Sequence, residues 1–413
     1  SYTFKERDYE ILFYDIQFFG GSTSFDPIPN DVLTDENLFP TGNIYYQSGN
    51  NTPNPNEYNS TVSNTAFYVS NEADLLPSLK TIVGVRAENF VQRHTGRDQR
   101  FASGDPNGNN LDDEKVLDAL DFFPSVNLIY ALGEEQNLRG GYSRTIARPS
   151  FKELSFAQII DPVTNRIFNG SLFSLQDWDG NLVETRIDNI DLRWELFMEG
   201  GQIFSISGFY KRFDQPIELI RLPQAATSAE FQPRNVGDGQ LFGLEFEVRK
   251  KLNFISPALE NFSFSGNVTV VESQIDMTNA EFSNRQLFER EGQTIEDTRQ
   301  MAGQAPYVIN AGFTYGNRDK GIDAGLFYNV KGETLEIVGT GLYPDIFFQP
   351  FHSLNFSFNK KLGADQNTTI DFGINNILND ELESFYQSFE AEPQVFNRVN
   401  PGVSLSVGIS HKF

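Results

Sequence analysis

The chain ends on the stretch Gly402-Val403-Ser404-Leu405-Ser406-Val407-Gly408-Ile409-Ser410-His411-Lys412-Phe413. Its apolar residues alternate with serine or glycine, and this period of two is typical of a β-strand with two different faces. The polar face is small, whereas a strand facing water normally carries Lys, Glu or Thr. The stretch therefore predicts either the edge strand of a soluble sandwich or a strand with one face in lipid. The upstream sequence decides between them.

The same alternation recurs along the whole sequence. At residues 242–249, for example, Phe242, Leu244, Phe246 and Val248 alternate with glycine, glutamate and arginine. The pattern predicts about fourteen strands. Their expected ranges are 1–14, 60–71, 79–93, 121–132, 137–147, 189–198, 202–220, 235–252, 261–272, 306–316, 321–332, 351–361, 368–378 and 402–413.

The connections between the predicted strands alternate between short and long. The short ones are 72–78, 133–136, 199–201, 253–260, 316–320 and 364–367, and the long ones are 20–58, 95–118, 148–182, 220–233, 277–303, 338–349 and 380–399. Short turns at one rim and long loops at the other are typical of outer-membrane β-barrels. A sandwich or a propeller has no reason to keep this parity. The sequence therefore predicts an all-β fold, a transmembrane antiparallel β-barrel, as a single domain over residues 1–413.

Composition is consistent with a barrel. No apolar run approaches the roughly 18 residues that a membrane-spanning helix needs, so a membrane location requires strands. The sequence contains 39 Phe and 15 Tyr, which fits aromatic girdles at the two membrane interfaces. A formal net charge of -24 makes nucleic acid an improbable partner. Charged residues among the first ten positions, such as Lys5 and Asp8, argue against a signal peptide at the start.

Several segments resemble TonB-dependent outer-membrane receptors, and the resemblance covers essentially the whole sequence. They are LRGGYSRTIARP (138–149), NIDLRWE (189–195), FYK (209–211), NVG (235–237) followed by GLE (243–245), GQAPY (303–307), NNILN (375–379) and the final strand ending in Phe413. Each segment alone is weak, but their order and spacing are specific.

The resemblance implies a 22-stranded barrel blocked by an N-terminal plug, with a TonB box ahead of the plug. This sequence shows no plug, no TonB box and too few strands. It is therefore expected to be the C-terminal part of such a barrel, with about eight strands missing, an even number that keeps the rim parity. The alternative is a complete barrel of about 14 strands, which the motifs disfavour.

The function implied is energised uptake, across the outer membrane of a Gram-negative bacterium, of a large scarce ligand such as a chelated-iron complex (a siderophore) or a glycan. The expected partners are outer-membrane lipid and TonB, the latter through the missing N-terminal region. The alternative is a structural or docking barrel in a larger outer-membrane assembly with a surface lipoprotein partner. The residues do not distinguish a siderophore from a haem, a glycan or a peptide.

Charged residues on the polar sides of the predicted strands are expected to face the barrel lumen or the plug. They are Arg86, Glu88, Arg193, Glu195, Lys211, Glu245, Glu247 and Arg249. Charges that lipid would not tolerate are accepted in a water-filled or plugged interior. They either contact the plug and line the ligand path, or form ion pairs of an ordinary barrel interior without selectivity.

One acidic segment has oxygen ligands at alternate positions around a glycine, as a calcium loop does. Its candidate ligands are Asp105, Asn107, Asn109, Asp112 and Glu114. Its glycine is not at the sixth position of an EF-hand loop, and a solvated acidic turn is the other interpretation. The shorter segment 177–181 is similar. No other cofactor is expected.

Enzymatic activity is not expected. The sequence has no Cys, its three histidines are far apart, and it lacks a nucleophile elbow, a zinc-protease motif and a phosphate loop. Iron-ligating clusters are also missing, so any iron would arrive already chelated. Ligand contacts are expected from aromatic residues in the predicted loops, namely Tyr45, Tyr46, Phe168, Phe173, Trp178, Tyr343 and Phe347. Alternatively, each of these packs on its loop neighbours.

Overall fold

A computed structural model describes residues 1–12, 14–19, 34–48, 53–161, 166–173, 180–222 and 229–413. The chain forms two compact units. One comprises Ser1–Ala66, Glu88–Leu120 and Pro149–Leu182, and the other comprises Phe67–Ala87, Asp121–Arg148 and Val183–Phe413. The second unit contains most of the strands. None of the described helices is long and apolar enough to cross a lipid bilayer.

Fourteen antiparallel strands follow one another in the hydrogen-bonding order of the main sheet. They are β1 (Tyr2–Tyr9), β4 (Tyr58–Leu76), β5 (Leu79–Arg97), β6 (Asn110–Ala131), β7 (Gln136–Ala147), β10 (Thr185–Met198), β11 (Gln202–Asp214), β14 (Gly239–Lys251), β15 (Phe262–Asp276), β17 (Tyr307–Asn317), β18 (Ile322–Lys331), β21 (Phe351–Leu362), β22 (Thr368–Asn375) and β25 (Ser404–His411). The prediction of about 14 antiparallel strands is confirmed.

The connections contain further elements. The strands are β2 (Tyr14–Phe18), β3 (Ile44–Ser48), β8 (Gln158–Asp161), β9 (Arg166–Asn169), β12 (Ile217–Arg221), β13 (Ala229–Asn235), β16 (Thr298–Arg299), β19 (Thr334–Ile337), β20 (Asp345–Phe348), β23 (Leu382–Gln387) and β24 (Gln394–Val399). The helices are α1 (Gln99–Ala102) and α2 (Asn279–Leu287), with 3₁₀ turns η2 (Leu252–Phe254) and η3 (Pro257–Leu259).

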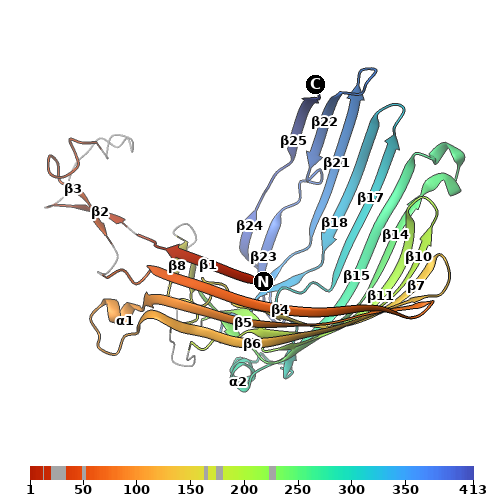
Figure 1. Cartoon of the computed structure of the whole chain (residues 1–413). Coiled ribbons are helices and arrows are strands. Elements are labelled where there is room, and N and C mark those ends of the chain that lie inside the picture. The colour runs from red at the N-terminus through yellow and green to blue at the C-terminus, as the bar shows by residue number, and fades with distance from the viewer. Residues whose placement is uncertain (13, 20–33, 49–52, 162–165, 174–179, 223–228) are drawn as a thin grey trace. The chain divides into compact units, whose positions relative to one another are not determined.

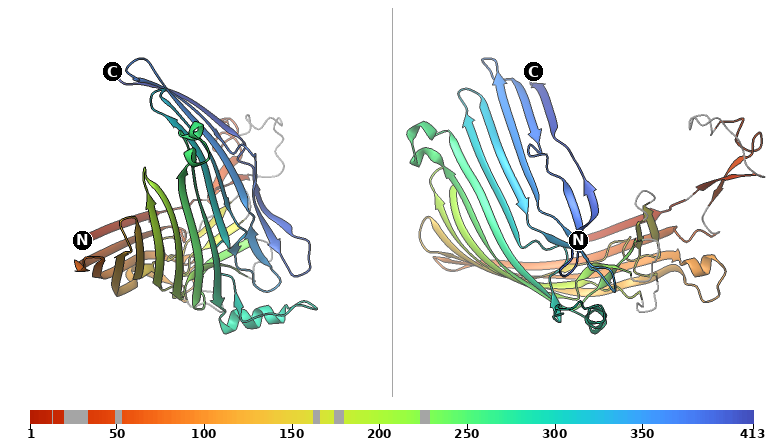
Figure 2. Two further views of the ribbon diagram at one scale, coloured as in Figure 1. Left: turned by 90° about the vertical axis from the view of Figure 1, so that its right-hand side faces the viewer. Right: turned by 180° about the vertical axis from the view of Figure 1, so that it is seen from behind.

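Short and long connections lie at opposite ends of the strands in the second unit. Figure 1 shows the turns that join β10 to β11, β14 to β15 and β21 to β22 at one end, and α2 at the other. The view from behind in Figure 2 shows the same separation. The alternation predicted from connection length is therefore present in the described part of this unit.

Cross-strand register sorts the side chains of the main sheet into two faces. One row runs Trp194–Ile206–Phe246–Val268–Ile309–Val330 from β10 to β18, and we call its side of the sheet the apolar face. The next row runs Glu195–Ser205–Glu247–Asn267–Asn310–Asn329 through the same strands, and we call that side the polar face. Because side chains alternate along every strand, each row keeps its character across the sheet.

Much of the apolar face is not covered by protein. Leu192 and Leu244 are 57% and 53% exposed, whereas Glu195 on the polar face is 7% exposed. An apolar surface of this extent, open while the polar face is partly buried, reverses the usual arrangement of a soluble protein. It fits a sheet whose outer face contacts lipid.

The buried hydrophobic clusters of the second unit lie among the long connections, away from the middle of the sheet. One cluster contains Ile220, Val236, Ile275, Met301, Leu335 and Val338, and a second contains Phe231, Ile337 and Ile346. The connections expected to be irregular therefore have cores of their own, and β19, β20, β23 and β24 form a small antiparallel sheet there.

Several predicted boundaries are wrong. The first strand ends at Tyr9 instead of residue 14, and β6 begins at Asn110, inside the predicted 95–118 loop. The polar residues of 110–120 gave no strand signal, yet they extend the same β-strand. The predicted strand 202–220 is divided into β11 and β12 because Gln215 has a positive φ of 49° and Pro216 lacks the N–H that a ladder needs.

Leu244→Arg and Glu245→Arg test the assignment of the two faces. Leu244 lies on the apolar face and Glu245 on the polar face of β14. Arginine at position 244 should destabilise the folded protein in lipid by about 2–4 kcal/mol, since it places a cation in hydrocarbon. Arginine at position 245 should cost much less. Urea titration of both variants in lipid vesicles measures the difference. Equal stabilities would contradict the assignment of the two faces.

Candidate functional site

A ladder of ion pairs crosses the polar face on β7, β10 and β14. The Arg139 and Arg193 guanidiniums lie 2.6 and 2.9 Å from the Glu195 carboxylate, and Arg193 also lies 2.7 Å from Glu247. Arg193 further donates a hydrogen bond to the Ser207 hydroxyl. Because Glu195 is nearly buried, its two arginine partners compensate the cost of removing the carboxylate from water.

The structure brings together three of the eight predicted lumen charges: Arg193, Glu195 and Glu247. Lys211, Glu245 and Arg249 share their face by register. Arg86 and Glu88 lie on one face of β5, and Glu88 accepts a hydrogen bond from Asn64. Arg139 is a member of the ladder that was not among the predicted lumen charges. Residues 139 and 141 lie on the same face of a strand with period two, and this alternation was the available signal that Arg139 lies on the polar face.

Asparagine side chains continue the same row beyond β14. The Asn310 amide donates to Asn267 Oδ1 at 2.6 Å, and the Asn329 amide donates to Asn310 Oδ1 at 2.5 Å. Together with Ser265, Gly312, Phe327 and Asn355, they line a hollow of about 280 Å³, which Glu247 and Arg249 also border. In the rows of Asn310 and Gly312, the polar face therefore changes from charged up to β14 to neutral on β15 to β18, and Asp323 and Lys331 lie nearer the ends of β18.

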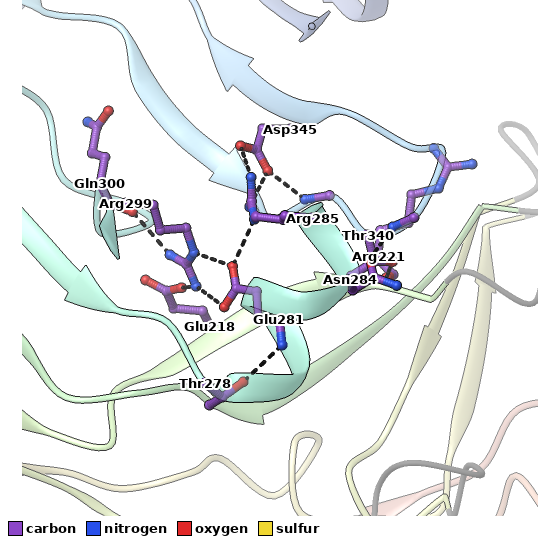
Figure 3. A network of polar contacts seen from close by, with 12 residues as sticks. Glu218, Arg221, Thr278, Glu281, Asn284, Arg285, Arg299, Gln300, Thr340 and Asp345 are labelled. Atoms are coloured by element: carbon purple, nitrogen blue, oxygen red, sulfur yellow. Dashed lines mark hydrogen bonds and ion pairs between the residues drawn. The ribbon is translucent and has the colours of Figure 1, made fainter. Parts of the chain in front are cut away.

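A second polar network ties the long connections of the second unit to one another. Arg299 of β16 lies 2.7 Å from Glu218 of β12 and 2.6 Å from Glu281 of α2. Arg285 of α2 bridges Glu281 and Asp345 of β20. Figure 3 shows Glu218, Glu281 and Arg299 converging. The network joins four elements from three different connections.

Local sequence explains how α2 presents these groups. Thr278 accepts a hydrogen bond from the Glu281 backbone N–H and so caps the helix. Glu281 and Arg285, four residues apart, lie on the same helix face. Burial alone would lower the pKa of Arg299, but Glu218 and Glu281 outweigh it and raise that pKa above its ordinary value. The two carboxylates therefore favour the charged form of the Arg299 guanidinium.

Arg221, at the end of β12, joins two more connections. Its guanidinium carbon lies 3.6 Å from the centre of the Tyr343 ring, and Nη1 donates to the Tyr386 hydroxyl at 2.8 Å. Thr340 donates to the Arg221 carbonyl oxygen. A cation held over an aromatic face with little solvent access is a strong contact. Tyr343, predicted to contact ligand, therefore contacts Arg221 in the structure.

The other predicted loop aromatics are dispersed. Tyr45 stacks on Phe19 with ring centres 4.4 Å apart, and Tyr46 is half exposed. Phe168 lies beneath the Lys152 ammonium. Phe173 is partly buried, and Phe347 packs against the cluster around Ile220. Trp178 lies outside the described residues. The structure does not gather these side chains at one place in either unit, and ligand contact by any of them stays a prediction.

The acidic segment around Asp105 has partners within the protein. Asp105 pairs with Arg100 at 2.8 Å and accepts from the Asn107 backbone, while the Asn109 side chain donates to Asp98. Asp112 and Glu114 lie in β6. Among the described residues, no group of three or more His, Asp or Glu side chains is placed to hold a metal ion. Calcium binding stays a prediction, and residues 177 and 179 of the shorter segment are not described.

A cluster of two carboxylates and two arginines lies where β6, β7 and β10 meet the long connections. Asp121 is 3.2 Å from Arg148 and 3.4 Å from Arg186, and Glu184 is 3.7 and 3.6 Å from the same two groups. Burial, helped by the neighbouring Asp121, raises the pKa of Glu184 to about 7. Glu184 precedes β10, whose apolar face begins at Ile190, and so lies outside the lipid-facing rows.

Arg299→Met should leave Glu218 buried without its counter-ion and Glu281 with Arg285 as its remaining partner. Breaking one side of a buried pair costs about 3–5 kcal/mol, so backbone amides of residues 298–302 should exchange with deuterium much faster than in the wild type. The control is Arg398→Met, whose guanidinium is half exposed beside Glu383 and whose loss should cost at most about 1 kcal/mol. Equal exchange rates in the two variants would show that the Arg299 network does not stabilise the loops.

Glu184→Gln should change how stability depends on pH. The folded state, with a Glu184 pKa of about 7 against an ordinary value of 4.5, binds a proton more tightly than the unfolded state. Stability of the wild type should therefore fall as pH rises between these two values. The variant should show a flatter profile, and Glu134→Gln, in an exposed turn, should follow the wild type. Urea midpoints at successive pH values measure the profiles, and a wild-type slope in Glu184→Gln would contradict the assignment.

Comparisons with known proteins agree with this geometry. Residues 2–377 match the family model described as TonB dependent receptor-like, beta-barrel. No curated protein sequence matches the chain.

Solved structures with a similar fold include the ferric enterobactin receptor PfeA of Pseudomonas aeruginosa (TM-score 0.51, 14% identity, covering 86% of this chain and 46% of that one). They also include the ferric-catecholate import receptor Fiu of E. coli K12 (TM-score 0.56, 11% identity, covering 86% of this chain and 45% of that one). A third is the copper transporter OprC (TM-score 0.59, 13% identity, covering 89% of this chain and 50% of that one). The chain spans about half the length of each of these structures. Family model and strand arrangement together show that this chain belongs to the TonB-dependent receptors, whose barrels lie in the outer membrane of Gram-negative bacteria.

Proposed function

We propose that this chain is the barrel wall of a receptor that takes up a scarce ligand, too large for porins, with energy delivered by TonB. The observation that carries the proposal is the two-faced sheet of a family member: one face apolar and open, the other lined by paired charges and amides. A wall of this kind separates lipid from an interior through which a polar ligand passes.

Two regions of the polar face differ in charge, which supports two different roles within the wall. On β7, β10 and β14 the Arg139–Glu195–Arg193–Glu247 ladder offers both signs of charge to a plug packed against it. Arg193 and Glu195 each have two ion-pair partners, so each can turn toward a charge on the plug and keep one partner in the wall. On β15 to β18 the middle rows of the face are neutral and hollowed. We assign the first region to plug contact and the second to the ligand path.

The long connections support capture of the ligand from outside. The Arg299 network and the contacts of Arg221 with Tyr343 and Tyr386 join four of them. A fixed loop loses less conformational entropy when it binds. Leu287 and Leu342 project from the same connections and are 77% and 81% exposed. The rigid network therefore offers apolar side chains on which a ligand would dock.

The family and the similar structures are receptors and transporters, which favours transport over catalysis. The relatives are described as taking iron chelates or copper, and for this chain the ligand stays open between a chelated metal and a glycan. TonB would engage the N-terminal region of the whole protein. The surface lipoprotein partner stays a prediction.

The requirement for TonB is tested with the intact gene in its own host. Depletion of ferric chelates, haem, copper and oligosaccharides from the medium is compared in wild-type cells, cells lacking the gene and cells lacking TonB. Uptake of at least one ligand should fall to the same low level in both mutants. The proposal would be abandoned if the ligand lost in the gene deletion were still taken up at the wild-type rate without TonB.

A further inference from the structure

The neutral part of the polar face contains an aromatic ring that lies flat on the sheet. Phe327 of β18 faces Gly312 of β17 across the ladder, and Gly325 precedes it by two residues on the same face. A Cβ atom on Gly312 would come within 2.9 Å of the ring, and one on Gly325 within 2.5 Å. Both glycines are therefore needed for the ring to lie where it does.

The upper side of this ring is open and surrounded by amides. Phe327 is 42% exposed. Asn355 lies directly opposite it on β21, and Asn329 follows two residues later on β18. Asn355 is fixed by hydrogen bonds with Ser353 and with the Asn376 backbone. Ring and amides thus form a rigid platform, which we define as Phe327, Asn267, Asn310, Asn329 and Asn355.

The asparagine chain ends in groups that the protein does not use. Asn310 is bonded on both sides, but Asn329 Oδ1 has no protein partner among the described residues, and neither has the Asn267 amide nitrogen. An amide offers two donors and an acceptor with two lone pairs. The platform therefore presents one free acceptor near the ring and one free donor two strands away.

No charged side chain adjoins the ring in the rows of Phe327 and Asn329: on β18 itself the nearest charges of this face, Asp323 and Lys331, lie four residues from Phe327 in either direction, ~13 Å at the usual rise per residue. Arg249, in the same cross-strand row as Phe327, is three strands away, which is ~14 Å at the usual strand spacing. Glu247 at the same edge of the hollow is neutralised by Arg193. A ligand group seated on Phe327 would meet a π-face and neutral amides only. An anionic chelate would gain no ion pair there.

We propose that this platform binds a pyranose ring of a neutral saccharide. A sugar ring presents polarised C–H groups on one face, which suit the negative face of an aromatic ring, and hydroxyl groups at its edge, which suit amides. The hollow of about 280 Å³ accepts one ring-sized group and lies near the lower end of the roughly 300–1,000 Å³ of small-ligand sites. The saccharide site rests on the proposed uptake function, because the ligand must move along the polar face.

A purely structural role for Phe327 makes a different prediction. An aromatic ring over glycines also protects a sheet, and any apolar side chain of similar size, such as leucine, would partly replace it. Leucine, however, has no flat π-face for a sugar. Phe327→Leu and Phe327→Tyr therefore separate the two roles, since tyrosine keeps the ring.

The test measures binding of three neutral oligosaccharides, built from glucose, mannose or N-acetylglucosamine, to the purified full-length protein by calorimetry. The detergent should be an amine oxide, because maltoside detergents carry a sugar. At least one oligosaccharide should bind. Phe327→Leu should weaken that binding at least tenfold, Phe327→Tyr by less than threefold, and Asn329→Ala severalfold. Phe313→Leu, on the apolar face of the adjacent strand, should bind as the wild type does.

Two results would overturn the saccharide site: no binding of any of the three oligosaccharides by the wild type, or equal affinity in Phe327→Leu. A variant that fails to fold is recognised by loss of the heat-modifiable mobility of a folded barrel, and Asn329→Ala then carries the test. Purified protein needs no TonB to bind. Loss of TonB dependence in cells would therefore overturn the proposed uptake, and loss of binding in vitro only the saccharide site.

Discussion

Pairing of every strand with its neighbours is the constraint on which the rest of this structure depends. In hydrocarbon an unpaired backbone N–H or C=O costs several kcal/mol, so strands in lipid must lie in one continuous ladder. The ladder fixes register, and register fixes which residues stand in a row. Trp194, Ile206 and Phe246 come from three different strands and share a row only because the hydrogen bonds between those strands align them.

The same register builds the polar face. Glu195 on β10 and Glu247 on β14 are 52 residues apart in the sequence, yet Arg193 reaches both. Farther along the row, three asparagines from β15, β17 and β18 form a chain of hydrogen bonds. A one-residue slip of any strand would move its polar side chains into lipid, so the rows and the membrane stabilise one another.

The long connections follow a different physical rule. They have water on one side, so they cannot rely on lipid and need cores of their own. Ile220, Met301 and Val338 form such a core from three connections, and Arg299 of the polar network lies two residues from Met301. The buried ion pairs specify the arrangement of the connections as well as stabilising it, because only one arrangement of the elements pairs all of the ions.

The sequence by itself determined the strand count, the alternation of faces and the rim parity, because these are local properties of period and turn residues. The faces of Leu244, Glu245 and Arg249 could be read in the same way. Tertiary structure alone decided which strand residues meet across the sheet, that Arg139 joins the ladder, and that Arg299 closes a network between distant connections. Those contacts depend on register and on packing between segments far apart in the sequence, which no local pattern records. It also placed Tyr343 against Arg221 and Phe347 against the cluster around Ile220.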